Sequence, residues 1–219
     1  DVYKRQIMNF QMASEMMTGV SETVLINDDV AVEDSSYTTG RRGVAATVIV
    51  EKIVGSLAET GGSLKECKIL GDKVNRNSGS MGVAFSSCTV PAAGKPTFKL
   101  GPDEMEFGVG IHGEPGRRRD KVQSAQEITN ELLGAIIEDL KLENNGEILL
   151  FVNGMGGTPL TELYLLYDNA KKTLDNKNIK IARSLVGNYC TSLEMQGASL
   201  TITKLDQELK KHWDSPVHT

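Results

Sequence analysis

The sequence predicts an α/β fold, because segments typical of buried strands alternate along the chain with segments typical of amphipathic helices. The clearest helix is expected over Ser124–Leu142, where apolar residues recur every three or four positions. The clearest strand is expected over Glu147–Asn153, which contains the apolar run Ile-Leu-Leu-Phe-Val. At 219 residues the chain is long enough for one large domain or two small ones.

Before residue 80 we expect a helix over Ile7–Met17, a buried strand over Thr23–Ile26, a helix over Val44–Glu59 and another helix from Ser63. Apolar residues of the third segment share one helical face, and two glycines follow its end. Ser63 precedes Glu66 by three positions, which is the pattern of a capping box. Asn75–Ser80, rich in Asn, Ser and Gly, is the best candidate for a linker.

Beyond residue 80 we expect strands over Met81–Ser86, Glu104–Ile111, Ile179–Leu185 and Ser199–Thr203, a helix after Pro159 and a short helix from about Leu205. A glycine loop, Gly154–Pro159, joins a predicted strand to the first of these helices. Such a layout can bind phosphate through backbone N–H groups, although no Walker sequence follows. Thr158 as N-cap and Pro159 at the first helical position explain the loop without a ligand, and we favour that interpretation.

Acidic residues follow the first predicted strand at Asn27-Asp28-Asp29. At the carboxyl end of a strand they could hold a metal ion or a proton. More often such residues open a turn or cap the next helix, and we favour this second interpretation.

Composition excludes several classes of function. The net charge of -5 argues against nucleic acid or an anionic membrane as the main partner, and Arg117–Arg119 is expected to be a solvated loop. No apolar run is long enough to cross a bilayer. Three cysteines without metal-ligand spacing predict reduced thiols in a cytoplasmic protein, with Cys88 and Cys190 as small core residues.

The segment Glu104–Gly116 is the most informative for function. Its alternation places Met105, Phe107, Val109 and Ile111 on one strand face, and Glu106, Gly108, Gly110 and His112 on the other. The two glycines would leave a bare floor beside His112, on which a small molecule could lie. An imidazole in that setting is typical of a nucleophile or a proton carrier, although a surface histidine in a glycine turn fits the same pattern.

Three further stretches give this histidine a context: Cys88–Pro96, Asp29–Val44 and Trp213–Thr219. Together with Gly108–Gly116, they resemble the substrate-binding K subunit of dihydroxyacetone kinases. The resemblance runs from about Ile7 to Thr219. It is strongest to the form that receives its phosphate from the phosphoenolpyruvate phosphotransferase system.

The resemblance implies two α/β domains. Residues 1–79 would be the remnant of the first, and residues 80–219 the second, with a mixed sheet flanked by helices. Residues 1–6 are expected to be non-native, and Gln6 stands where the family has a catalytic aspartate. Since the first domain would be incomplete, the apolar faces of Ile7–Met17 and Val44–Glu59 would lack their sheet, and we expect poor solubility or self-association.

The resemblance also implies a chemistry for His112, which would bind dihydroxyacetone as a covalent hemiaminal. Magnesium and nucleotide would belong to a separate L subunit, so no cofactor or metal is expected here, and the family is expected to be homodimeric. Glu106 and Glu114 could orient the imidazole. His212 and His218 are expected at a surface or an interface.

Two other functions stay open at this point. A non-catalytic paralogue could capture dihydroxyacetone through the same histidine and act as a transcriptional co-activator. A more distant possibility is a phosphate-binding domain that uses Gly154–Thr158. An ATP-dependent enzyme with a fused nucleotide-binding domain would share the same K-type sequence.

Overall fold

The computed structural model describes residues 2–32, 40–111 and 116–216. Within these residues six strands form a mixed sheet in the order β5-β4-β1-β8-β6-β7, and two short strands form a separate hairpin. The strands are β1 Ser78–Ala84, β2 Thr89–Val90, β3 Lys95–Pro96, β4 Glu104–Phe107, β5 Arg118–Lys121, β6 Glu147–Gly154, β7 Lys180–Gly187 and β8 Gly197–Lys204. The helices are α1 Val2–Met16, α2 Ala46–Glu59, α3 Leu64–Arg76, α4 Ala125–Leu140, α5 Leu160–Asn176 and α6 Gln207–Trp213. Neighbouring strands are antiparallel except β6 and β7, which are parallel.

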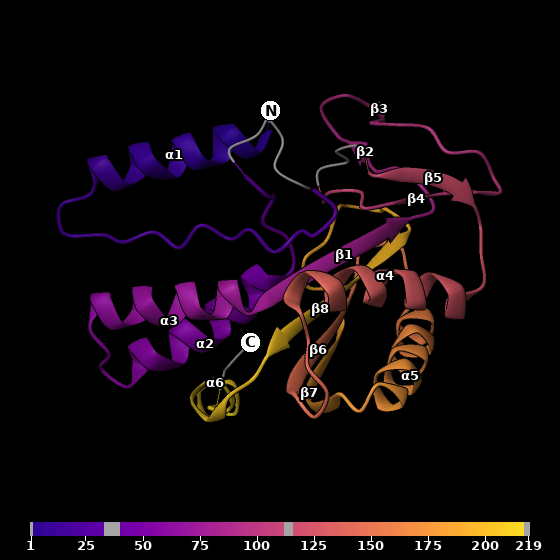
Figure 1. Ribbon diagram of the computed structural model, residues 1–219. Coiled ribbons are helices and arrows are strands. Elements are labelled where there is room, and N and C mark those ends of the chain that lie inside the picture. The colour runs from indigo at the N-terminus through magenta and orange to yellow at the C-terminus, as the bar shows by residue number, and fades with distance from the viewer. Residues whose placement is uncertain (1, 33–39, 112–115, 217–219) are drawn as a thin grey trace.

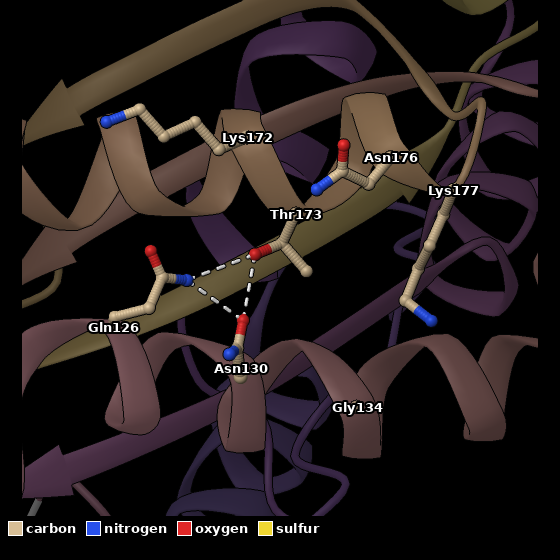
Figure 2. Close-up of a pocket in the computed structure, with 7 residues that line it drawn as sticks. All are labelled: Gln126, Asn130, Gly134, Lys172, Thr173, Asn176 and Lys177. Atoms are coloured by element: carbon tan, nitrogen blue, oxygen red, sulfur yellow. Dashed lines mark hydrogen bonds between the residues drawn. The ribbon is translucent and has the colours of Figure 1, made fainter.

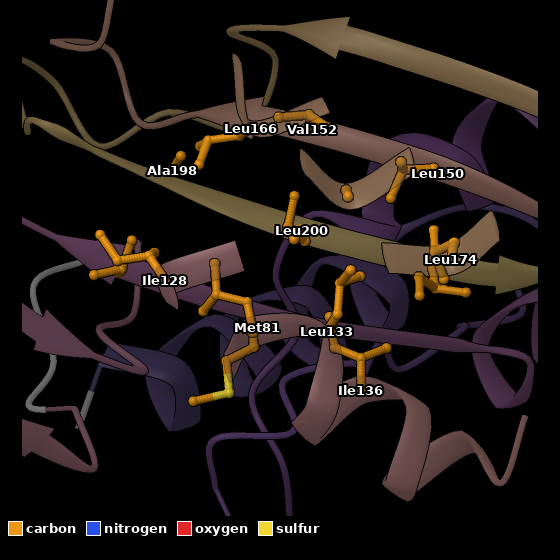
Figure 3. Packing of buried hydrophobic residues seen from close by; sticks show 14 of the residues in the cluster. Met81, Ile128, Leu133, Ile136, Leu150, Val152, Leu166, Leu174, Ala198 and Leu200 are labelled. Carbon is orange, nitrogen blue, oxygen red and sulfur yellow. The ribbon is translucent and has the colours of Figure 1, made fainter. Parts of the chain in front are cut away.

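Helices cover both faces of the large sheet (Figure 1). Side chains of β6 alternate between the faces, as the two-residue repeat of a strand requires. Ile148, Leu150 and Val152 lie in a core with α4 and α5, part of which is shown in Figure 3. Leu149 and Phe151 lie in a second core with α2, α3 and α6. The predicted α/β class, a mixed sheet flanked by helices, is confirmed.

Helix α4 forms as its sequence predicts. Ser124 and Glu127 make a reciprocal capping box at its start, and the same arrangement joins Ser63 to Glu66 at the start of α3. One stripe of α4 is buried against the sheet: Ile128, Leu132, Leu133, Ile136 and Leu140. Local capping and the helical repeat therefore account for this element without help from distant residues.

Helix α2 differs from its prediction. The expectation that Val44–Glu59 lacks its sheet is wrong, because α2 packs on the second face of the large sheet. Ile49 and Ile53 are completely buried and share a core with Phe151 of β6. Residues before 80 therefore contribute to the core of the sheet that follows them.

Helix α1 agrees with the prediction of an uncovered apolar face. Five of its residues or near neighbours have more than half of their surface exposed: Met8, Phe10, Met12, Met16 and Met17. In Figure 1, α1 stands apart from the other helices and the sheet. The division of the chain into domains at residue 80 stays a prediction, and β1 begins two residues before it.

Two segments before β1 also differ from their predictions. Thr23–Ile26 forms no strand in the described part of the chain, where Val24 and Ile26 instead pack at the edge of the second core and Leu25 is exposed. Asn75–Ser80 is not a linker, since it ends α3 and begins β1. Its polar residues have buried partners: the Ser78 hydroxyl donates to the Val74 carbonyl at 2.8 Å and lies 2.7 Å from the Thr203 hydroxyl.

The basic run Arg117–Arg119 leads into the edge strand β5 and is therefore not the loop that was expected, although its three arginines are exposed as predicted. Arg119 pairs with Glu106 at 2.9 Å, and the guanidinium of Arg118 lies 5.1 Å from the centre of the Phe107 ring. Opposite charges on paired strands stabilise this edge. Among the described residues, none of the helices could cross a membrane.

Candidate functional site

Strand β4 ends at Phe107, four residues earlier than the alternation predicts. Gly108 has a φ of +76°, a left-handed conformation that interrupts the two-residue repeat. Met105 and Phe107 lie in the first core, whereas Val109 lies in a small separate cluster with Cys88 and Met155. The shared face predicted for residues 105–111 is therefore wrong, while the face predicted for His112 lies outside the described residues.

The predicted bare floor is filled at Gly108. A Cβ atom placed on this glycine would lie 2.5 Å from the Cβ of Ala31. The N–H of Gly108 also donates to the Gly82 carbonyl at 2.6 Å. Both the conformation and the contact require glycine here, so its presence is no evidence for a ligand.

The loop that follows β4 returns to β5 beside its starting point. The N–H of Arg117 donates to the Phe107 carbonyl at 2.7 Å, and the N–H of Gly116 donates to Oε1 of Glu106 at 2.8 Å. Glu106 is buried and accepts from Arg119 through Oε2. Its carboxylate therefore holds the base of the loop.

The predicted catalytic and substrate-binding residue, His112, lies outside the described residues, as do Glu114 and His218. The roles assigned to His112 stay predictions. What the structure supplies is the framework on either side of it, which consists of residues 106–111 and 116–119.

A segment from the first part of the chain lies against this framework. Residues 28–31 run beside β1, where Val30 donates to the Ser80 carbonyl at 2.9 Å and Ser80 donates to the Asp28 carbonyl at 2.7 Å. Arg117 reaches the same segment, since its Nε donates to the Ala31 carbonyl at 2.8 Å. The stretch Asp28–Ala31 thus connects β1 to the end of the loop.

Asp28 caps helix α2, as the favoured interpretation of the acidic pair predicts. Its carboxylate accepts from the N–H groups of Val44 at 2.8 Å and Ala46 at 2.9 Å, and from the Ser80 hydroxyl. Burial is the main influence on this group and raises the pKa of Asp28. The carboxylate is fully committed to these three donors.

Asp29 pairs with Arg42. Nε of Arg42 donates to Oδ2 of Asp29 at 2.8 Å, and Nη2 lies 2.7 Å from the same oxygen. Burial raises the pKa of Asp29 to about 6, while the positive charge of Arg42 opposes that rise. Nη2 also donates to the Gly108 carbonyl at 2.8 Å. Gly108 is the first residue of the segment 108–117 between β4 and β5, which contains His112 and is called the histidine loop below, so the ion pair contacts the start of that loop. No local pattern in the sequence indicates a role for Arg42, because this contact joins residues 66 positions apart.

The loop Gly154–Pro159 is explained by packing. A Cβ atom on Gly156 would lie 1.8 Å from the Leu193 carbonyl oxygen, and one on Gly157 would lie 2.4 Å from that of Glu194. The Thr158 hydroxyl bridges the Gly197 backbone at 2.7 and 2.9 Å and does not cap α5, so the predicted N-cap is wrong. These glycines leave room for the backbone of residues 193–194, which is a structural role, as predicted.

The remaining candidate groups lie elsewhere. His212 is buried, with Nδ1 3.0 Å from the Ser56 hydroxyl, so the expected surface position is wrong. Cys67, Cys88 and Cys190 are free thiols, and burial raises the pKa of Cys190 to about 11. Cys88 is a core residue as predicted, whereas Cys190 is half-buried at the edge of the second core. Over residues 2–32, 40–111 and 116–216, no cluster of His, Cys, Asp and Glu could hold a metal ion.

A groove of about 750 Å³ lies between α4 and α5, on the outside of the first core. Figure 2 shows Gln126, Asn130 and Thr173 joined there by hydrogen bonds, with Lys172 and Lys177 at its rim. Lys172 is neutralised by Asp168 four positions earlier on the same helix. None of the groove residues belongs to the histidine loop or its framework.

Comparison with known proteins identifies the family to which the chain belongs. The family model of the Dak1 domain matches residues 2–219, and the chain belongs to that family. The dihydroxyacetone-binding subunit DhaK of PTS-dependent dihydroxyacetone kinase 1 from Listeria innocua is 47% identical over 209 residues, which cover 94% of this chain and 64% of the relative. The corresponding subunit from Lactococcus lactis is 47% identical over 221 residues, 99% of this chain and 67% of the relative. The chain therefore spans about two thirds of the length of these curated relatives.

Solved structures agree with the fold. The dihydroxyacetone kinase operon co-activator Dha-DhaQ superposes with a TM-score of 0.82 at 32% identity, over 88% of this chain and 60% of its own. The dihydroxyacetone kinase of C. freundii gives a TM-score of 0.77 at 27% identity, over 94% of this chain and 36% of its own. The predicted resemblance to the phosphotransferase-dependent K subunits is confirmed.

Proposed function

We propose that this chain is the greater part of the dihydroxyacetone-binding subunit of a phosphotransferase-dependent dihydroxyacetone kinase. The observation that carries the proposal is its 47% identity, over nearly its whole length, to subunits of that description from two organisms. The chain also contains the sequence Gly-Val-Gly-Ile-His-Gly-Glu-Pro-Gly at 108–116, which carries the resemblance at His112. Both subunit types that carry this domain, kinase and co-activator, would need to hold the same ketone.

His112 is the proposed anchor for that ketone. A neutral imidazole nitrogen attacks the carbonyl carbon, and a C–N bond forms as the C=O π electrons move to oxygen. The oxygen gains a proton and the imidazole loses its N–H proton, so the product is a neutral hemiaminal. Glycerol has no carbonyl and cannot form the adduct, which gives selectivity. The covalent bond also orients the terminal hydroxyl for phosphoryl transfer.

A partner subunit that carries nucleotide and magnesium would then transfer the phosphoryl group to this hydroxyl and give dihydroxyacetone phosphate. Gln6 occupies the position where the resemblance implies the carboxylate that deprotonates the hydroxyl. We therefore expect the 219-residue chain to bind the ketone but to be inactive as a kinase by itself. A cytoplasmic homodimer is part of the same proposal.

A second function is supported by the superposition on the co-activator Dha-DhaQ, whose TM-score is 0.82. In that case His112 would capture dihydroxyacetone without phosphoryl transfer. The sequence identity is 32% to this structure and 47% to the kinase subunits, which favours the kinase. Restoring an aspartate at position 6 separates the two, since only a kinase subunit would gain turnover with its partner subunit.

The proposal is tested by carbon NMR with dihydroxyacetone labelled at its ketone carbon. Two proteins are used: the chain as it stands, and a fusion that adds the N-terminal region of the Lactococcus lactis relative. A protein-bound signal moved from the ketone to the hemiaminal position is expected with both proteins, and none with the His112→Ala variant of the fusion. A fusion that melts cooperatively and gives no such signal would contradict the proposal.

A further inference from the structure

The histidine loop is held at its first residue by a side chain from a distant part of the sequence. Nη2 of Arg42 donates to the Gly108 carbonyl at 2.8 Å, while Nε donates to Asp29. Arg42 and Asp29 are both buried, with 7% and 3% of their surface exposed. We propose that Arg42 is a positioning residue for the loop that carries His112. This inference rests on the proposed function and adds a residue to its site.

The guanidinium of Arg42 is held in position by contacts that do not involve the loop. Asp29 is itself held, because its Oδ1 accepts from the Ala31 N–H at 2.9 Å. The backbone N–H of Asp29 donates to the Arg42 carbonyl at 3.1 Å, so the two residues are also joined through their main chains. A planar guanidinium presents several donors in one rigid fork, which allows it to bind a carboxylate and a carbonyl together.

The contact at Gly108 sets the direction in which the chain leaves β4. The Gly108 N–H is bound to the Gly82 carbonyl, and the Gly108 carbonyl is bound to Arg42. The peptide planes before and after the Cα atom are therefore both fixed. Glycine would otherwise be the residue with the widest choice of φ and ψ at this point. With both planes fixed, the path into Val109–Ile111 is determined.

The other end of the loop is bound to the same segment of the chain. Nε of Arg117 donates to the Ala31 carbonyl, two residues after Asp29. The segment containing Asp29 and Ala31 therefore contacts the residues on both sides of 112–115. A shift of this segment would move both ends of the loop together.

Stability alone is a weak reason for this ion pair. Replacing a buried ion pair by apolar residues is often neutral or stabilising, since burial removes the hydration of both charges. An apolar pair could fill the same space, but it could not donate to the Gly108 carbonyl. The feature that requires arginine is the link to the loop.

The test uses four variants of the fusion protein: Arg42→Met, Arg42→Lys, the double variant Asp29→Asn/Arg42→Met, and Arg183→Met as a control. Arg183 makes an arginine–aspartate pair with Asp214, with Nε 2.6 Å from Oδ1, which is more exposed than the Arg42 pair and lies at the far edge of the sheet. The double variant removes both charges, so no unpaired buried charge remains to unfold the protein. Hemiaminal formation with labelled dihydroxyacetone, thermal melting and amide hydrogen exchange at Gly108 and Arg117 are measured on each.

We expect Arg42→Met to weaken the apparent affinity for dihydroxyacetone at least about tenfold, since a misplacement near 1 Å can cost about a hundredfold in reactivity. The double variant should recover most of the melting temperature lost in Arg42→Met. It should still bind dihydroxyacetone at least about tenfold more weakly than wild type, and its Gly108 amide hydrogen should exchange faster than that of wild type. Arg42→Lys should fall between wild type and Arg42→Met, and Arg183→Met should bind like wild type.

Two outcomes would overturn the assignment in different ways. A double variant that melts like wild type and also binds dihydroxyacetone like wild type would refute the positioning role and leave the proposed function intact. Absence of an adduct in the unmodified fusion would refute the proposed function, and with it the role of Arg42, whatever the exchange data show.

Discussion

Replacing Gly108 by alanine should lower the free energy of unfolding by about 2–5 kcal/mol, which is the sum of two effects. A φ of +76° costs a residue with a Cβ roughly 1–2 kcal/mol. The added Cβ would also lie 2.5 Å from that of Ala31, and overpacking of this kind costs about 1–3 kcal/mol. Urea unfolding followed by circular dichroism measures the change as a lower midpoint at constant slope.

Gly134→Ala provides the matched control. Gly134 lies in the middle of α4, and a Cβ atom there would have no neighbour within 4 Å. The same chemical change should therefore stabilise the protein by up to about 1 kcal/mol, because alanine is the better helix former. A glycine-to-alanine change is thus expected to have opposite signs at the two positions.

The double variant Gly108→Ala/Ala31→Gly separates the two effects. It removes the clash with residue 31 and keeps the unfavourable φ, so a double-mutant cycle should give a coupling energy of about 1–3 kcal/mol between the two positions. A Gly108→Ala variant as stable as wild type would refute the reasoning. In that case neither the backbone nor Ala31 would require glycine, and a ligand floor would again be the better explanation of this residue.

Three further outcomes are expected. Ile53→Ala should cost about 2–5 kcal/mol of unfolding free energy, because Ile53 is completely buried against the sheet, whereas Phe10→Ala should change it by less than about 0.5 kcal/mol. The 219-residue chain should self-associate through α1, so its sedimentation coefficient should rise with concentration, and Phe10→Glu, at a position 72% exposed, should reduce that rise. The raised pKa of Asp29, about 6, means that the folded state holds this proton more tightly than the unfolded chain. The contribution of Asp29 to the unfolding free energy should therefore fall by up to about 3 kcal/mol as the pH rises from 4 to 7, so urea titrations should show the stability of wild type falling relative to that of Asp29→Asn over this range.

The parts of the fold that the sequence predicts are those with local causes. The stripe of α4 follows from the helical repeat, and its start follows from two residues three positions apart, Ser124 and Glu127. The same holds for Ser63 and Glu66 in α3. Strand β6 is apolar because it is covered on both faces, which its continuous apolar run indicates.

The parts that the sequence does not predict depend on contacts between distant residues. Asn75–Ser80 has the composition of a linker, and its burial follows from partners such as Thr203 in another strand. The end of β4 follows from the fit of Gly108 against Ala31, a residue 77 positions earlier (108 − 31). The resemblance led us to expect that α2 lacks a sheet to pack on. In the structure β6 presents apolar side chains on both faces, and α2 packs on one of them.

The same distinction separates the histidine from the residues that position it. His112 can be recognised in the sequence, since an imidazole among glycines and a resemblance to a family are both readable from one short segment. Arg42 stands in a segment that supports the same resemblance, but its contact with Gly108 exists only once α2 and the preceding turn have packed on the sheet. If the loop is positioned through this contact, substitutions of Asp29 and Arg42 should alter ketone binding through the loop. The segment before residue 80 would then contribute to the chemistry of the loop as well as to the core of the fold.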